Sequence, residues 1–212
     1  MSVARRAGWA VVLVLALLGA GTATWCGLGD GGACRAPATL RDLDGRCVRL
    51  DTPPGAAAPD ARPTGGRFEA PAQGLDVPLS VTSGSDGVLD PPTLTEAFVL
   101  DDPGRTTDAG VRPLVVAMHA VRDGRAPGNA FFERGARDPA VTVAPGDALR
   151  VDGATYVVEG TEVLAKDAAA VSPEVWGRRT DGARRLVVLT CLQRTGASGA
   201  ARENLVIHAV LA

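Results

Sequence analysis

The chain has 212 residues and a formal net charge of −2, with 22 Lys and Arg residues against 24 Asp and Glu residues. This balance argues against a nucleic-acid-binding protein, which would show a surplus or a patch of basic residues. Aromatic residues make up only 4% of the chain, so a core has to be built mainly from Val, Leu and Ala. With both ends removed, about 140 residues remain, which is enough for one domain with its own core.

The N-terminal residues 1–25 have the pattern of an exported protein. Arg5 and Arg6 precede an apolar stretch, residues 7–25, that contains no charged residue. A stretch of this length can just cross a bilayer, and basic residues before it favour a cytoplasmic N-terminus. The sequence therefore predicts a short cytoplasmic stub and a single membrane anchor, with an extracytoplasmic domain behind it.

A cleaved signal peptide explains the same stretch equally well, because Gly21-Thr22-Ala23 offers a cleavage site of small residues. The protein would then be secreted. A lipoprotein is a weaker alternative, since the bulky Trp25 directly precedes Cys26, where a small residue is wanted. All three alternatives export the rest of the chain.

Residues 26–66 show no hydrophobic periodicity. Pro53-Pro54-Gly55 and the Ala- and Pro-rich run after it are typical of a semi-extended tether without a core. The sequence thus predicts an extracytoplasmic linker over 26–66 and a folded domain over 67–212.

Three of the four cysteines, Cys26, Cys34 and Cys47, cluster near the N-terminus, and Cys191 lies far from them. In an exported protein the sequence favours a Cys34–Cys47 disulfide, which leaves Cys26 unpaired and Cys191 free. The competing arrangement pairs all four cysteines in two bridges and would inactivate the Cys191 thiol.

The region 67–212 contains short apolar runs separated by turn signals such as Pro145-Gly146-Asp147 and Asp152-Gly153, the second of which suits a hairpin. Many short strands with little helical periodicity indicate a β-barrel or a β-sandwich. One or more helical turns are expected at Asp167–Trp176, with Asp167 as the N-cap. The predicted strands are 67–70, 77–81, 96–100, 114–118, 141–143, 148–152, 155–163, 186–190 and 205–211.

Three chemically capable residues lie at the ends of predicted strands. Cys191 follows the apolar run 186–190, and Arg202 precedes the last strand, which we expect to pair with that run. His119 directly follows the strand 114–118. A thiol nucleophile, an imidazole acid–base and a guanidinium for developing negative charge form a coherent catalytic set.

Each of these residues also has a purely structural interpretation. A single cysteine is often a small buried hydrophobic residue, and Arg202 alone would be an ordinary surface charge. His208, the other histidine, lies inside the last strand and is expected to be structural or exposed. Only the order and spacing of His119, Cys191 and Arg202 favour catalysis.

The same motifs resemble those of the sortases, which are cysteine transpeptidases of Gram-positive cell surfaces. The resemblance rests on Val116-Ala117-Met118-His119, Leu189-Thr190-Cys191 and Arg202-Glu203-Asn204, and connecting segments extend it over about 67–212. It is strongest to the actinobacterial class F members. Many of these have Gly before the His and Gly-Gly after the Cys, whereas this chain has Met118, Leu192 and Gln193.

The resemblance implies an eight-stranded β-barrel, with short helices in its loops, and a two-step acyl transfer. Cys191 would attack the carbonyl after a threonine in a C-terminal sorting signal of a surface protein, and His119 would protonate the leaving amine. Arg202 would stabilise the oxyanion, and Thr190 would help to shape the substrate groove. An amine of a cell-wall precursor, or water, would then resolve the thioester.

Other functions remain open at this point. One is a non-catalytic surface β-module that binds a peptide or a wall polymer, and another is a cysteine peptidase that mainly hydrolyses. No cluster has the spacing of a zinc site, and no P-loop or dinucleotide-binding glycine pattern follows a strand. We therefore expect no metal, no cofactor and no nucleic-acid partner.

Overall fold

The computed structural model describes residues 34, 38–51, 61–83, 90–101, 112–178 and 181–212. The chain divides into two compact units, and all of the described residues belong to the second, Ala33–Ala212. The expected membrane segment and Cys26 lie outside the described residues. Within the described part, no helix has both the length and the hydrophobicity to span a membrane.

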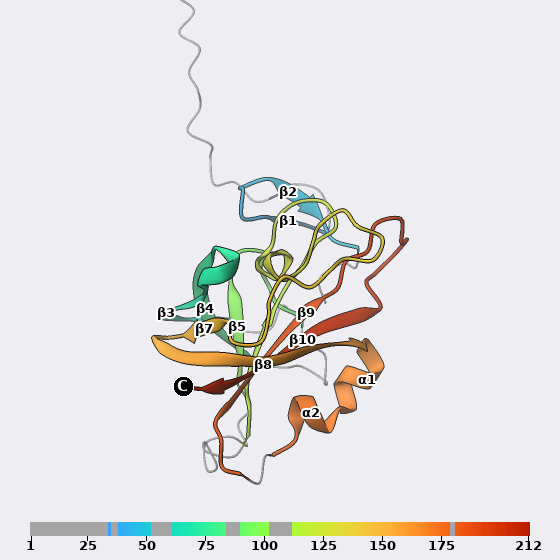
Figure 1. Ribbon diagram of the computed structural model, residues 1–212. Coiled ribbons are helices and arrows are strands. Elements are labelled where there is room, and N and C mark those ends of the chain that lie inside the picture. The colour runs from blue at the N-terminus through green and yellow to red at the C-terminus, as the bar shows by residue number, and fades with distance from the viewer. Residues whose placement is uncertain (1–33, 35–37, 52–60, 84–89, 102–111, 179–180) are drawn as a thin grey trace, which may run out of the picture. The chain divides into compact units, whose positions relative to one another are not determined.

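Eight strands of this unit form a closed barrel in the order β10-β8-β7-β3-β4-β5-β6-β9 (Figure 1). Most neighbours are antiparallel, but β4 pairs with β5, and β6 with β9, in parallel. The predicted mostly-β fold with a closed barrel is therefore confirmed. The strands are β3 (Arg62–Ala70), β4 (Leu75–Ser83), β5 (Ala97–Asp101), β6 (Leu114–Met118), β7 (Ala148–Val151), β8 (Ala154–Ala165), β9 (Arg185–Cys191) and β10 (Glu203–Leu211).

The middle of strand β9, residues 186–189, is continuously apolar because both of its faces are buried. Leu186 and Val188 belong to the main core, together with side chains from the other barrel strands. Val187 and Leu189 belong to a second cluster, in which they pack with residues that include Val175 of the short helix α2 (Pro173–Trp176). This double burial explains why the sequence shows a continuous apolar run rather than an alternating one.

The turn between β7 and β8 is the hairpin that Asp152-Gly153 predicts. Both residues have positive φ, 49° for Asp152 and 79° for Gly153. Positive φ at both central residues is the requirement of a two-residue type I′ turn, which Asp and Gly tolerate best. The register confirms the hairpin, because Val151 pairs with Ala154 directly across this turn.

The helical segment differs in detail from the prediction Asp167–Trp176. It consists of α1 (Lys166–Val171) and α2, and it breaks at Ser172 because Pro173 has no N–H to continue the first helix. The N-cap of α1 is Ala165, so the prediction that Asp167 caps the helix was wrong. Asp167 lies instead in the first turn, where its carboxylate accepts a hydrogen bond of 2.8 Å from the Ala168 amide.

Ordered structure also occurs within 26–66, where the sequence predicts only a linker. Strand β3 begins at Arg62, and a hairpin of β1 (Thr39–Arg41) and β2 (Cys47–Arg49) precedes it. A Cys34–Cys47 disulfide closes this hairpin, as predicted. The strands are short and mostly polar, so their sequence has no apolar periodicity. Conversely, the predicted strand 141–143 does not form. Its only sheet-like pairing among the described residues is an isolated bridge between Phe132 and Val141.

Candidate functional site

A pocket of about 150 Å³ lies where strands β6 and β9 end. The two strands are parallel neighbours, and Met118 pairs with Thr190 at their last shared position. His119 directly follows Met118, and Cys191 directly follows Thr190. Both residues line the pocket. The structure thus brings together two residues that are far apart in the sequence.

Cys191 ends β9 in a setting that keeps its thiol accessible. It is the free cysteine of the described residues and is partly exposed, so it is neither sealed in the core nor engaged in a second disulfide. Its partner across the sheet is Asn204 of β10, which also lines the pocket. The alternative with two disulfides is wrong, and a partly open cysteine is the kind that can react.

The ring of His119 is oriented by a backbone carbonyl. Its Nε2 lies 2.6 Å from the carbonyl oxygen of Pro91, and 3.8 Å from Oδ1 of Asp90. A carbonyl oxygen only accepts, so Nε2 carries the hydrogen, and the neutral ring keeps its lone pair on Nδ1. The imidazole is therefore held as a base with one defined accepting nitrogen.

The pKa of His119 lies below its ordinary value of 6.5. Burial is the largest cause, and the positive charge of Lys166 acts in the same direction, while the hydrogen bond to Pro91 and the charge of Asp90 oppose it. The side chain is only 13% exposed, which explains why burial dominates. The ring is consequently neutral at pH 7.

The backbone of His119 is fixed by the 3₁₀ helix η3 (Pro127–Phe131). The Gly128 amide donates a hydrogen bond of 2.8 Å to the His119 carbonyl oxygen. A Cβ at Gly128 would overlap with Oγ1 of Thr190 and lie 2.8 Å from the same carbonyl. Only glycine therefore allows η3 to lie this close to the ends of β6 and β9.

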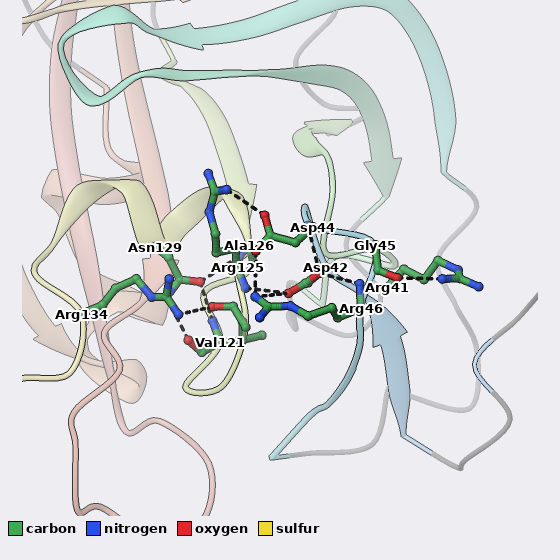
Figure 2. Close-up of polar contacts among 11 residues, drawn as sticks. Arg41, Asp42, Asp44, Gly45, Arg46, Val121, Arg125, Ala126, Asn129 and Arg134 are labelled. Atoms are coloured by element: carbon green, nitrogen blue, oxygen red, sulfur yellow. Dashed lines mark hydrogen bonds and ion pairs between the residues drawn. The ribbon is translucent and has the colours of Figure 1, made fainter. Parts of the chain in front are cut away.

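Asn129 holds the chain just beyond His119. Its side-chain oxygen accepts hydrogen bonds from the amides of Val121 (3.1 Å) and Ala126 (2.9 Å), and its Nδ2 donates to the Val121 carbonyl at 2.9 Å (Figure 2). Gln193, two residues after Cys191, donates a further bond of 2.9 Å to the Ala120 carbonyl. The Asn129 bonds hold the segment after the imidazole, and the Gln193 bond ties that segment to the one after the thiol.

Thr190 lines the pocket, in the position that the resemblance assigns to it. The residue is only 3% exposed, and its Oγ1 is buried with no hydrogen-bond partner among the described residues. Its close approach to Gly128 indicates a packing role at the pocket floor.

Arg202 is not among the residues that line the pocket. It is exposed and lies one residue before β10, where its carbonyl oxygen accepts a hydrogen bond of 3.0 Å from the Lys166 amide. Extension of the β9–β10 register places it opposite Gln193, two positions from Cys191 on the same face. The structure therefore puts Arg202 next to the pocket rather than in it.

Lys166 lines the pocket and was missed by the sequence reasoning as a site residue. It is the only lysine of the chain, and this rarity was the one available signal. Its position follows from the end of β8, since α1 begins at Lys166 directly after that strand.

The disulfide-closed hairpin supplies another wall of the pocket through Arg49, Leu50 and Asp51. Asp51 forms an ion pair of 3.1 Å with Arg122, and Arg122 also donates to the Gly199 carbonyl at 2.9 Å. No sequence pattern marks these residues as part of a site, because their place depends on how the hairpin docks.

Docking of the hairpin depends on Asp42, whose side chain is buried (Figure 2). Its carboxylate accepts hydrogen bonds from the amides of Asp44 (3.0 Å), Arg46 (2.9 Å) and Arg125 (3.0 Å). Burial alone would raise the pKa of Asp42, but the three amides and the Arg46 guanidinium together hold it below the ordinary value of 3.8. The bond from Arg125 joins the hairpin to the loop that follows His119.

The described residues contain no group of three His, Cys, Asp or Glu side chains that could hold a metal ion. The polar groups at the pocket are instead a thiol, an imidazole, a hydroxyl, two amides and several charged side chains. Such a set is suited to nucleophilic and acid–base chemistry.

No family model and no curated protein matches the chain. Among solved structures, sortase A from Listeria monocytogenes is 19% identical at a TM-score of 0.44, with 69% of this chain and 86% of that chain covered. A lid mutant of sortase A from Corynebacterium diphtheriae is 15% identical at 0.45, covering 69% of each chain. Sortase C-1 from Streptococcus pneumoniae is 16% identical at 0.45, covering 69% and 66%. At identities this low, the chemistry of the site has to be argued from the residues of this chain.

Proposed function

We propose that this protein is an exported sortase-type cysteine transpeptidase. One observation supports this most strongly: the parallel neighbours β6 and β9 end in one pocket, with His119 after the first and Cys191 at the end of the second. The sequence motifs around these two residues resemble those of the sortases, with class F as the nearest subgroup. The substrate is a surface protein with a threonine-containing C-terminal sorting signal.

In the first step, Nδ1 of His119 takes the proton of the Cys191 thiol, and the sulfur adds to the peptide carbonyl carbon after the threonine. The resulting tetrahedral intermediate collapses as the C–N bond breaks, and the leaving amine takes the proton from the imidazolium. A thioester on Cys191 and a new amine are the products. The low pKa of His119 supports this step, because a neutral ring can accept the thiol proton at pH 7.

In the second step, an amine of a cell-wall precursor attacks the thioester and releases the Cys191 thiol, which regains its proton. A peptide bond replaces the thioester, so no oxidant, reductant or cofactor is consumed. Water in place of the amine makes the same protein a hydrolase.

The oxyanion needs a cationic or hydrogen-bonding partner during both steps. Arg202 is our candidate, because it directly precedes β10, whose Asn204 pairs with Cys191, and because its neighbour Ala201 lines the pocket. Thr190 supports the pocket floor through its contact with η3 rather than by touching the reacting atoms.

The Cys34–Cys47 disulfide supports the extracytoplasmic location, because disulfides persist in oxidising compartments. We therefore place the domain outside the membrane, attached by the apolar N-terminal stretch or secreted after its cleavage.

Intact-protein mass spectrometry with a threonine-containing sorting peptide tests the proposal. We expect a covalent adduct on Cys191 in the wild type and none in Cys191→Ala, while both show the same thermal unfolding. Product analysis with and without an added amine then separates transfer from hydrolysis. A Cys191→Ala variant that processes the peptide at the wild-type rate would refute the proposal. A Cys191 thiol that reacts with no peptide, and only slowly with alkylating reagents, would also refute it and is the result expected for a non-catalytic binding module.

A further inference from the structure

The hairpin 38–51 belongs to the pocket as well as to the fold. Arg49 and Leu50 line the pocket from β2 and from the residue after it. Val48, between the flanking polar residues of β2, is buried in a cluster with Leu94 and Val121. The packing of Val48 thus anchors the backbone of the hairpin beside the site, which brings Arg49 and Leu50 to the pocket.

The charges around the pocket are unevenly compensated. Asp51 is paired with Arg122 at 3.1 Å, whereas Asp90 lies 3.8 Å from the His119 ring, which is neutral and does not offset its charge. Arg49 and Lys166 are both exposed, and the structure gives neither side chain an ion-pair or hydrogen-bond partner among the described residues. Two uncompensated cations therefore flank the pocket, one from the hairpin and one from the start of α1.

We propose that Arg49 and Lys166 are specificity-determining residues that select an acyl-donor peptide with a carboxylate side chain next to the cleaved bond. The inference rests on the proposed function and names the substrate class of the same site. A guanidinium and an ammonium on separate elements can each bind a carboxylate that enters between them, and their field raises the local concentration of acidic peptides.

A peptide fits these observations better than an anionic wall polymer does. A polymer would be held by an extended basic surface, whereas this chain has a net charge of −2. Here the two free cations converge on a pocket of about 150 Å³ that also contains Cys191, so a carboxylate bound there is close to the reacting carbonyl.

The test uses sorting peptides in matched pairs, with Glu or Gln placed in turn at each of four positions flanking the threonine. We measure kcat/KM for adduct formation on the folded domain. At one position the wild type should have a higher kcat/KM for the Glu peptide than for the Gln peptide. Each of the two cations should contribute a factor of about five to this ratio, which is the upper range for an exposed ion pair. Added salt should reduce the ratio. Arg49→Gln and Lys166→Gln should each lower that Glu-to-Gln ratio, mainly through KM.

Arg41→Gln is the matched control, because Arg41 lies on the same hairpin but does not line the pocket. It should keep the wild-type ratio. Lys166→Gln will also alter the pKa of His119, but this changes both peptides of a pair equally and cancels in the ratio.

Equal rates for Glu and Gln peptides at every position, or an unchanged ratio in both Arg49→Gln and Lys166→Gln, would overturn the inference while leaving the proposed function intact. A soluble polyphosphate that inhibits through Arg49 and Lys166 better than any acidic peptide would overturn it in favour of a polymer. If no peptide reacts at all, the proposed function fails, and calorimetric binding of the Glu and Gln peptides to Cys191→Ala still decides whether the pocket selects a carboxylate.

Discussion

The Nε2 of His119 donates its hydrogen bond to the carbonyl oxygen of Pro91, 2.6 Å away, and not to a carboxylate. Asp90, the nearest carboxylate described, is 3.8 Å from the same atom. The hydrogen bond to Pro91 therefore orients the ring and also raises its pKa, whereas Asp90 and Lys166 act on the pKa through their charges. The contribution of the charges can be tested by substitutions that leave the Pro91 carbonyl in place.

The first prediction concerns the charges around His119. Lys166→Gln should raise the pKa of His119, because it removes a positive charge that opposes protonation, and Asp90→Asn should lower it. The chain has only two histidines, so proton NMR titration resolves both rings, and His208 serves as an internal control. Shifts of the same sign in the two variants would contradict the assignment.

The second prediction concerns stability in acid. Because burial holds the pKa of His119 below 6.5, the unfolded chain binds a proton that the folded protein does not. The free energy of unfolding should be highest above pH 6.5 and should fall as the pH drops through the folded pKa. Urea unfolding between pH 5 and 8 measures this, and His119→Asn should flatten the dependence. A steeper dependence in the variant would refute it.

The third prediction concerns the contact of η3 with the strand ends. Gly128→Ala should destabilise the protein by about 1–3 kcal/mol, because the added methyl overlaps with Oγ1 of Thr190 and crowds the His119 carbonyl. It should also slow alkylation of Cys191 or broaden the His119 resonance. Gly160→Ala is the control: nothing lies within 4 Å of its Cβ position, so it should cost less than about 0.5 kcal/mol. Equal effects would remove the argument for a glycine requirement.

The fourth prediction concerns the disulfide. Its cysteines are 13 residues apart, and opening a loop of about this size removes about 3 kcal/mol from the stability of the closed segment. The double variant Cys34→Ser and Cys47→Ser should therefore speed hydrogen exchange at the Arg46 and Arg125 amides, which bond Asp42. Amides of the β9–β10 ladder should keep their protection. Uniformly faster exchange would mean that the hairpin is part of the barrel's cooperative unit.

Much of the barrel could be predicted from the sequence, because its central strands are short apolar runs with clear ends. Strand β6 has the predicted bounds, and β9 differs from its prediction by one residue at each end. The pairing of β9 with β10 was also predicted. His119 and Cys191 were identifiable because both lie at ends of such runs.

The hairpin β1–β2 could not be predicted in this way. Its strands have three residues each, and tertiary contacts hold it: the disulfide, the buried carboxylate of Asp42 and the packing of Val48. The same limit applies to Arg202 and Lys166. A strand pattern predicts which end of the sheet a residue reaches, but not whether a side chain beyond the strand lines the pocket.

The parallel pairing of β6 with β9 has a consequence for the order in which the barrel folds. The segments β7, β8, α1 and α2 all lie between these strands in the chain, so this contact carries a large loop-closure cost and should form late. The sulfur and the imidazole come to the same pocket only when this pairing is made. A nascent or partly folded chain therefore has a thiol but not the base beside it, and its acylating activity should appear in the same kinetic phase as the native barrel.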